Sequence, residues 1–540
     1  MKYIASSVMI AICLVISTAA EAMPCTDPLD TTEGPIKGKV ARSDEACSWL
    51  GVPFASPPVG ELRLRAPVPP ANRDWVLEAD QYGFACPQVE SIMSGGEARG
   101  FDEDCLTLNI WKPRKSGLFP VMVFIHGGGF TQGTGTYEMY NGARLAAIGD
   151  VVVVTINYRL AALGYMALPE LKEEDPDGST GNYGILDQVR ALEWVRDNIE
   201  GFSGDPDKVT IFGQSAGGMS VCTLMVSPLS EGLFHRAVNM SGPCQMMKNY
   251  DQAVQRSETM VENLGCDDSD DVTECLRSLP FEDFVKKDEN HLFAMGVDYA
   301  PTVDGHVLTG MPMDLIREGK YHRVPTMAGC ARDELRLYTI MVTGINALPR
   351  LTIKQLMKSI TGDNYEEVMA MYEWKDYRRP VDLAFSFGTD IAFASVDYAM
   401  GEAISDEVPF YMYRFDWDDT RFPHKMGAFH GLDLPLLFSA LELDSRLAKM
   451  LANKKAIESG VPLSEKMIGY YTNFAATGDP NGVGPGGEEL PEWPAYDTET
   501  KYRMYFDNPP QARPLSEMEV KRLEYYSSRE IDEVLKGRGD

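Results

Sequence analysis

Short apolar runs alternate with helical patterns through the middle of the chain. The runs are rich in β-branched and aromatic residues, and turn-forming residues follow most of them, which is typical of strands buried on both faces. They span residues 121–125, 151–156, 209–212, 237–240, 324–328 and 409–415. Between the second and third runs, residues 186–199 repeat apolar side chains at the helical period. This alternation predicts an α/β protein in which helices flank a large, mostly parallel, twisted sheet.

A Gly-x-Ser-x-Gly pattern follows the run 209–212 and opens a helical segment. It consists of Gly213, Gln214, Ser215, Ala216 and Gly217. A sharp strand-to-helix turn of this kind exposes the serine oxygen and needs small neighbours two residues away. The helix N-terminus also presents free N–H groups to developing negative charge. The alternative, a glycine-rich turn with an idle serine, does not require this strand-to-helix context, and we therefore expect Ser215 to be a nucleophile.

A second glycine-rich loop, from His126 to Gly129, follows the run 121–125. Acyl transfer builds an oxyanion that needs fixed N–H donors, and a loop without side chains brings its backbone close enough to supply them. A phosphate cradle would instead require a following lysine or a dinucleotide glycine pattern, and the sequence has neither. We expect His126 to shape this loop rather than to act as a base.

A serine nucleophile needs a histidine base, which in this kind of fold comes later in the chain. Of the six histidines after Ser215, His430 lies in a loop flanked by Gly427 and Gly431, beyond the run 409–415. That setting favours His430 as the base. His424 is the alternative, in a more polar stretch.

The base in turn needs a carboxylate that orients it, and this acid should follow a strand between the serine and the histidine. Asp333 and Glu334 lie shortly after the run 324–328. Position alone leaves the choice between these two residues open.

Several further stretches resemble a known family. They are Trp-Leu-Gly-Val-Pro-Phe-Ala at 49–55, Pro-Pro-Val-Gly at 57–60, Glu-Asp-Cys-Leu-Thr-Leu-Asn-Ile at 103–110 and Gly-Asn-Tyr-Gly-Ile-Leu-Asp-Gln at 181–188. With both glycine motifs, they make the chain similar to the type-B carboxylesterases, which include cholinesterases and bacterial para-nitrobenzyl esterases. The resemblance runs from about Gly34 to about Tyr496. It implies the α/β-hydrolase fold and a serine ester hydrolase.

The resemblance also implies a role for each candidate residue. It matches the acid to Glu334, with Arg332 where the family has lysine, and the base to His430. It matches the oxyanion donors to the N–H groups of Gly128, Gly129 and Ala216, and a supporting serine to Ser241. The implied reaction passes through an acyl-enzyme and requires no metal or cofactor.

Departures from the family pattern bear on the substrate. Residues 87–104 contain no tryptophan, whereas cholinesterases have one there to bind a quaternary ammonium. Gln214 is neutral where cholinesterases have glutamate. Insect juvenile hormone esterases share this glutamine and the Gly-x-x-His-x-x-Asp pattern of 427–433, but their arginine-phenylalanine pair is absent near Arg63. Leu335 stands where relatives often have glycine. We therefore expect small to medium uncharged esters rather than choline esters.

Other functions on the same fold remain alternatives. The stretch 87–104 offers Val89, Ile92, Met93 and Phe101 as an apolar lid, as a lipase or polyester hydrolase would need. An amidase would share every catalytic residue named above. A non-catalytic adhesion protein is disfavoured, because such proteins lose the serine and carry a membrane span.

The N-terminus predicts export. Lys2, an apolar stretch and Ala20-Glu21-Ala22 fit a signal peptide over residues 1–22, leaving a single catalytic domain over 23–540 that is secreted or periplasmic. No later stretch is apolar for long enough to span a bilayer. The net charge of −30 argues against nucleic acid and anionic membranes as partners and leaves a small-molecule ester as the expected ligand.

Ten cysteines are present, and one of them lies in the predicted signal peptide. Export permits disulfides, and the odd number that remains leaves one thiol over. The family resemblance implies the pairs Cys86–Cys105 and Cys266–Cys275. Cys25–Cys47 and Cys222–Cys244 are further candidate pairs, with Cys330 as the free thiol.

Overall fold

A computed structural model describes most of the chain. The described residues are 24–41, 45–90, 98–288, 298–337, 344–442, 446–529 and 534. The predicted signal peptide, residues 1–22, lies outside them. Within them, no helix combines the length and the apolar character needed to cross a bilayer.

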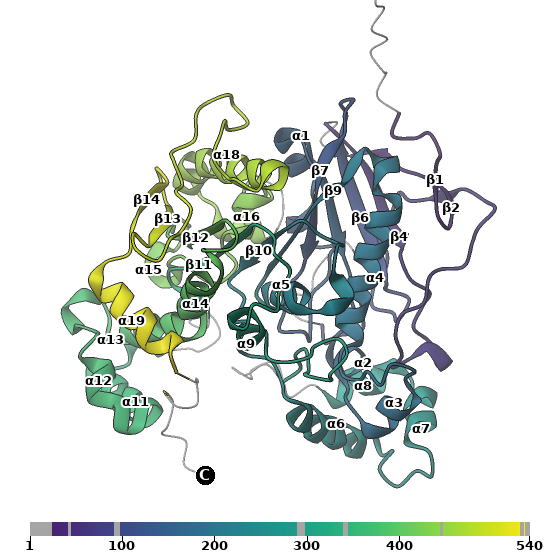
Figure 1. The fold of residues 1–540 in the computed structure, drawn as a ribbon, viewed down its shortest axis with the longest axis horizontal. Coiled ribbons are helices and arrows are strands. Elements are labelled where there is room, and N and C mark those ends of the chain that lie inside the picture. The colour runs from purple at the N-terminus through teal and green to yellow at the C-terminus, as the bar shows by residue number, and fades with distance from the viewer. Residues whose placement is uncertain are drawn as a thin grey trace, which may run out of the picture.

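A mixed sheet runs through the centre of the molecule (Figure 1). In the described chain it has eleven strands, in the order β14-β13-β12-β11-β10-β9-β7-β8-β6-β4-β3. The seven strands from β13 to β8 in this order are parallel, and the strands at both edges are antiparallel. The strands are β3 Lys39–Val40, β4 Ala46–Pro53, β6 Thr107–Pro113, β7 Phe119–Ile125, β8 Val152–Ile156, β9 Gly204–Gln214, β10 Arg236–Met240, β11 Thr326–Ala331, β12 Phe410–Phe415, β13 Tyr502–Phe506 and β14 Gln511–Pro514. A small separate sheet contains β1 Leu29–Thr31, β2 Gly34–Lys37 and β5 Leu77–Glu78.

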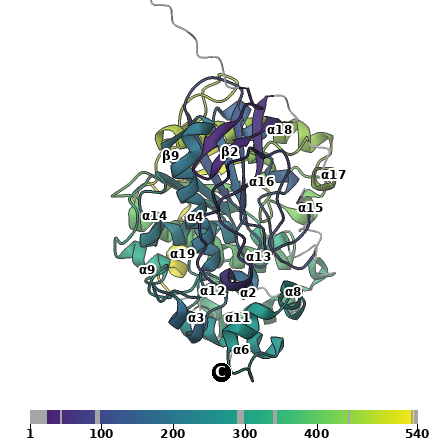
Figure 2. The ribbon, with the colours of Figure 1, turned by 90° about the vertical axis from the view of Figure 1, so that its right-hand side faces the viewer.

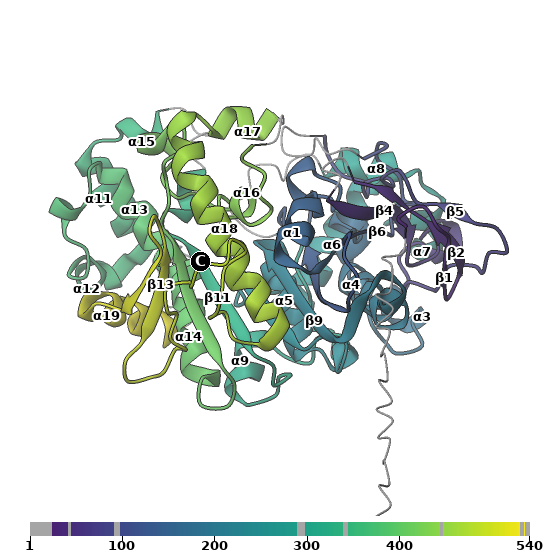
Figure 3. The same ribbon diagram turned by 90° about the horizontal axis from the view of Figure 1, so that it is seen from above.

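Helices cover both faces of the sheet, as the apolar runs predicted (Figure 3). Along β7, Val121, Val123 and Ile125 belong to one buried core, whereas Met122 and Phe124 belong to the other. This alternation follows from the two-residue period of a strand. The helices on the first face include α4 Tyr183–Asn198, α5 Ala216–Val226 and α14 Ser395–Ile404, and those on the second include α1 Ala143–Gly149 and α18 Lys454–Thr477.

The remaining helices lie largely in the connections between strands (Figures 1 and 2). Those after β8 and β10 are α2 Ala161–Tyr165, α3 Pro169–Glu174, α6 Tyr250–Leu264, α7 Val272–Ser278, α8 Phe281–Lys287 and α9 Pro312–Arg317. Those after β11 and β12 are α11 Arg350–Thr361, α12 Tyr365–Met369, α13 Pro380–Thr389, α15 Pro423–Met426, α16 Leu434–Leu437 and α17 Arg446–Leu451, and the chain continues past β14 into α19 Glu517–Ser527. Many of these helices gather at the end of the sheet where the parallel strands terminate, which is where α/β proteins build their sites.

All six predicted strands and the predicted helix are present, with bounds shifted by a few residues, or more at the start of β9. The apolar runs did not reveal β4, β6 or β13, because polar residues interrupt these strands. In β6, Asn109 is buried, and its side chain accepts a hydrogen bond from the Gly51 N–H at a bulge in β4. That partner becomes visible only when the two strands are paired.

Four disulfides confirm the expected pairing. They are Cys25–Cys47, Cys86–Cys105, Cys222–Cys244 and Cys266–Cys275. Cys330 is free and buried, as predicted, and burial raises the pKa of its thiol well above the ordinary value. It is therefore held in its unreactive protonated form.

Candidate active site

Ser215 lies at the sharp turn between β9 and α5, with φ of 60° and ψ of −123°. Its N–H donates to the Met240 carbonyl at 2.9 Å. A Cβ on Gly213 would lie 2.3 Å from the Gly217 carbonyl oxygen, and one on Gly217 would lie 2.0 Å from that of Ile125. Both glycines are therefore required sterically, which is the reason given for them from the sequence alone.

The glycine loop after β7 approaches this turn closely. A Cβ on Gly127 would lie 2.6 Å from the Gln214 carbonyl oxygen and 3.0 Å from the Cβ of Ser215. Gly128 and Gly129 have φ of 120° and 62°, and Phe130 continues at 60°. The left-handed backbone explains why the loop is glycine-rich.

His126 serves this loop as expected. It is buried and stacks on Tyr158 with ring centroids 4.3 Å apart, and its Nδ1 lies 2.8 Å from the Gly127 carbonyl oxygen. Burial lowers its pKa to about 4, so the ring is neutral near pH 7.

His430 and Glu334 meet from loops 96 residues apart, where Glu334 Oε2 accepts a hydrogen bond from His430 Nδ1. Glu334 is fully buried, and its other carboxylate oxygen accepts from the Ala331 N–H at 2.6 Å. Burial alone would lower the pKa of His430, but the charge of Glu334 and this hydrogen bond, with a further contribution from Asp433, raise it above the ordinary value. The pair is an oriented imidazole whose protonated form is stabilised.

Asp333, the other acid candidate, has a different position. Its carboxylate pairs with Arg332 at 2.8 Å and Arg336 at 3.1 Å. It also accepts from the Ala428 N–H at 3.1 Å, while its own N–H donates to the Ala428 carbonyl. Asp333 thus joins the acid loop to the histidine loop. His424, the alternative base, belongs to α15, and its side chain lies outside what the structure describes.

Sequence reasoning missed the hydrogen bond between Gln214 and the proposed base. The Gln214 side-chain amide nitrogen lies 3.1 Å from His430 Nε2. With the Nδ1 proton directed to Glu334, Nε2 is an acceptor and the amide donates to it. No local signal in the sequence could reveal a contact between residues 216 positions apart.

Two further polar side chains, of Ser241 and Asp433, are buried, and Asp433 lies close enough to His430 to affect its pKa. Within the described residues, the Oγ of Ser241 and both carboxylate oxygens of Asp433 have no hydrogen-bond partner. Burial and the charge of Glu334 raise the pKa of Asp433 to about 7, and these effects outweigh the opposing influence of His430 and nearby N–H groups.

A cavity of about 410 Å³ unites these elements. Gly128, Gly129, Ser215, Ala216, Glu334 and His430 all line it. The size is that of a small-molecule site. The Ser215 turn, the glycine loop and the His430–Glu334 pair come from separate segments of the chain and line one cavity.

The rest of the cavity wall is mainly apolar. Its large side chains include Leu163, Met219, Met246, Phe284, Phe393 and Leu434. Among the described residues that line it, the charged ones are Asp288, Asp298 and Glu334. Arg256 lies 2.5 Å from the Asp288 carboxylate and offsets its charge. Apart from the imidazole of His430, the described wall therefore offers no cationic side chain to hold an anionic group.

Comparison with known proteins shows the family of the chain. The model of the carboxylesterase family matches residues 26–523. The chain belongs to the carboxylesterase family. The match extends beyond the resemblance first noticed between residues 34 and 496, and this carboxylesterase has the mostly parallel sheet flanked by helices of the α/β-hydrolase fold.

Similar proteins include several esterases. A para-nitrobenzyl esterase of Bacillus subtilis (strain 168) is 34% identical over 494 residues, which cover 89% of this chain and 95% of the relative. A fumonisin B1 esterase of Sphingopyxis macrogoltabida is 34% identical, with 80% of this chain and 79% of the relative covered. A solved structure of a PNB esterase superposes with a TM-score of 0.79 at 33% identity and covers 92% of this chain and 99% of that one. This carboxylesterase is therefore an ester hydrolase by family.

Proposed function

We propose that this carboxylesterase hydrolyses small to medium neutral esters through an acyl-enzyme on Ser215, with His430 as base and Glu334 as the acid that orients it. One observation carries the proposal: the hydrogen-bonded His430–Glu334 pair lines the same cavity as the strained serine turn. This combination of a nucleophile, an oriented base and N–H donors is what acyl transfer requires.

In the proposed reaction, Ser215 Oγ attacks the ester carbonyl carbon while His430 Nε2 takes the hydroxyl proton. The Gln214 amide has to leave Nε2 for this step. The N–H groups of Gly128, Gly129 and Ala216 donate to the oxyanion of the tetrahedral intermediate. His430 then gives its proton to the departing alkoxide oxygen, and the alcohol leaves. A water molecule, deprotonated by His430, attacks the acyl-enzyme, and Ser215 regains the proton as the acid is released.

The wall of the cavity supports neutral substrates. Its described lining contains no arginine or lysine that would bind an anionic acyl or alcohol group. Among the described lining residues there is no tryptophan to bind a quaternary ammonium. Apolar side chains instead offer burial to uncharged acyl and alcohol groups.

The decisive assay uses para-nitrophenyl esters of increasing acyl length with the wild type, Ser215→Ala and His430→Ala. We expect the wild type to cleave short neutral esters and to be slow on an ester that carries a carboxylate. Both variants should be inert when circular dichroism shows that they are folded and when they are assayed at the same concentration as the wild type. Equal turnover by the wild type and Ser215→Ala would contradict the proposal.

We also propose that residues 1–22 are removed on export and that residues 23–540 form one catalytic domain. The four disulfides support an oxidising compartment, and the continuous eleven-stranded sheet of the described chain supports a single unit. Intact-mass analysis of protein exported with its own leader should give a chain that begins at Met23. Denatured protein should contain one titratable thiol. An uncleaved N-terminus would contradict removal of the leader, and more than one thiol would contradict the four disulfides and the oxidising compartment.

A further inference from the structure

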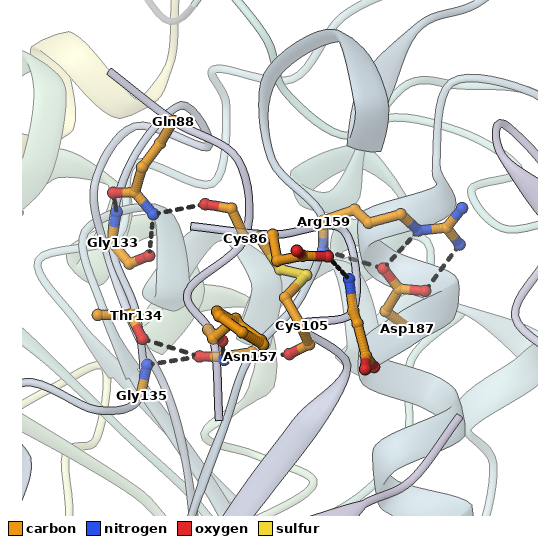
Figure 4. Close-up of a disulfide and its surroundings, with 12 residues drawn as sticks. Cys86, Gln88, Cys105, Gly133, Thr134, Gly135, Asn157, Arg159 and Asp187 are labelled. Atoms are coloured by element: carbon orange, nitrogen blue, oxygen red, sulfur yellow. Dashed lines mark hydrogen bonds and ion pairs between the residues drawn. A yellow bond between two sulfur atoms is a disulfide. The ribbon is translucent and has the colours of Figure 1, made fainter. Parts of the chain in front are cut away.

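The loop that begins with the glycine motif at His126 continues to Gly133, and Gln88 pairs with its backbone there from outside the loop (Figure 4). Its side-chain nitrogen donates to the Gly133 carbonyl at 2.8 Å, and its side-chain oxygen accepts from the Gly133 N–H at 2.8 Å. The nitrogen also donates to the Cys86 carbonyl at 3.0 Å. Gln88 is buried and lies two residues after Cys86, which the disulfide ties to Cys105.

This pairing uses the hydrogen-bonding groups of the Gln88 amide. Both N–H groups and the oxygen are engaged with backbone, and exchanging oxygen and nitrogen would set an NH₂ group against the Gly133 N–H. Although Gln88 lines the cavity, its amide is committed to the loop rather than available to a substrate.

Asn157 makes a second connection between the same two segments. Its side-chain oxygen accepts from the Gly135 N–H at 2.8 Å and from the Thr134 hydroxyl at 3.1 Å. Its nitrogen donates to the carbonyls of Phe84 at 2.9 Å and Cys105 at 3.1 Å. Two amide side chains thus fasten residues 133–135 to the disulfide segment (Figure 4).

The oxyanion donors need such external support. The N–H groups of Gly128 and Gly129 must stay free to meet the substrate oxygen, so hydrogen bonds within the protein cannot hold them directly. Backbone hydrogen bonds hold the carbonyls of Gly128 and Phe130, and the two ends of the loop are held as well. Gly127 is confined against Gln214 and Ser215, whereas Gly133 is held by Gln88. A Cβ on Gly128 would lie 2.0 Å from the Gln132 carbonyl oxygen, so a shift at this end reaches the donors directly.

We propose that Gln88 is a positioning residue that sets the oxyanion donors through Gly133. The inference rests on the proposed function, because it assigns the oxyanion to this loop. Gln88 acts on the transition state only, since the oxyanion forms there and not in the bound ester. Its loss should therefore lower kcat and leave KM nearly unchanged.

The test compares Gln88→Ala and Gln88→Glu with the wild type. Glutamate keeps the size and the acceptor, but it removes the N–H groups that meet Cys86 and Gly133 and sets negative charge against their carbonyls. Asn198→Ala is the matched control. Asn198 is also a buried amide that accepts from a backbone N–H, of Thr32 at 2.7 Å, and donates to a carbonyl, of Trp194 at 3.0 Å, but it does not line the cavity.

Two readouts separate positioning from structural support. The first is kcat and KM for a para-nitrophenyl ester, and the second is the inhibition constant of an aryl trifluoromethyl ketone, whose serine adduct carries the oxyanion. We expect both Gln88 variants to lose about 10- to 100-fold in kcat and to bind the ketone more weakly by a similar factor. Asn198→Ala should match the wild type in both, whatever its melting temperature.

The other outcomes distinguish failure of the positioning role from failure of the proposed function. If the wild type is active, Ser215→Ala is inert and a folded Gln88 variant equals Asn198→Ala in kcat and ketone binding, the positioning role is wrong while the proposed function stands. A raised KM at unchanged kcat would make Gln88 a substrate-binding residue and would also overturn the inference. If Gln88→Ala does not fold, kcat and ketone binding of the near-isosteric Gln88→Glu decide whether Gln88 is a positioning residue. A wild type inactive on every ester would contradict the proposed function itself.

Discussion

The Ser215 turn and the His430–Glu334 pair are built by different forces. Around Ser215, backbone contacts leave no room for a Cβ at Gly127, Gly213 or Gly217. His430 and Glu334 are joined instead by polar side-chain bonds between distant loops, in which burial and charge oppose each other. Steric exclusion leaves a glycine signature within a few residues of sequence, whereas the pairing with His430 leaves no local signal that distinguishes Glu334 from Asp333. Substitutions at the Ser215 turn should therefore act through side-chain volume. The His430–Glu334 pair should instead be sensitive to changes in charge and pH.

The largest effect is expected from charge removal at Glu334. Glu334→Gln keeps the shape but no longer orients the imidazole or stabilises its protonated form, so we expect kcat to fall by about 10³- to 10⁴-fold without loss of the fold. Steady-state kinetics with circular dichroism checks this. Asp333→Asn is the matched control and should lose far less activity, because its carboxylate contacts arginines and Ala428 rather than His430. The reverse order of losses would exchange the two assignments.

Adding a single methyl group should disrupt the packing around the Ser215 turn. In Gly217→Ala the added Cβ meets the Ile125 carbonyl oxygen at 2.0 Å, so α5 has to move away from β7. We expect a loss of about 1–3 kcal/mol in the free energy of unfolding and about 100-fold in kcat. Urea unfolding monitored by tryptophan fluorescence, together with kcat, checks this. Gly232→Ala, where a Cβ meets open space, is the steric control, although its positive φ also strains alanine slightly. A Gly217→Ala variant as stable and active as this control would refute the steric account.

The pH dependence of kcat/KM in the wild type tests the electrostatics of the His430–Glu334 pair. As the proposed base, His430 works only when neutral, and its pKa is raised above the ordinary 6.5, so kcat/KM should fall as the pH drops through a midpoint above 6.5. Asp433 titrates in the same range, with a pKa of about 7, and the observed limb therefore belongs to the coupled groups. Rates from pH 5 to 9 at low substrate concentration measure it. An acid limb centred below 6.5 would contradict the balance of burial and charge described above.

The smallest effect is expected at Asp433. Its negative charge contributes to the raised pKa of His430, so Asp433→Asn should move the acid limb of kcat/KM to lower pH. Tyr140, Tyr413 and Tyr471 also surround this carboxylate, but burial raises the pKa of each, so they stay neutral and do not compensate. An acid limb that is unchanged, or that moves to higher pH, would show that the charge of Asp433 does not raise the pKa of His430.

The same contrast explains what the sequence could predict. The buried strands and the Ser215 turn follow from apolar runs and glycine spacing, which are local. The choice between Asp333 and Glu334 required the family resemblance, because both follow the same strand and only the folded loops bring one of them to His430. The roles of Gln88, Asn157 and Gln214 were missed for the same reason. Each hydrogen-bonds to segments distant in sequence, and an isolated amide carries no positional signal.

The most direct test of the central claim is covalent labelling of Ser215. A fluorophosphonate loses fluoride when the serine oxygen attacks phosphorus, and intact-protein mass spectrometry counts the groups attached. We predict one phosphonyl group per chain, located by peptide mapping on Ser215, absent in Ser215→Ala and formed much more slowly in His430→Ala and Glu334→Gln. An enzyme that hydrolyses esters yet is labelled at another residue, or at the same rate in all these variants, would contradict the account.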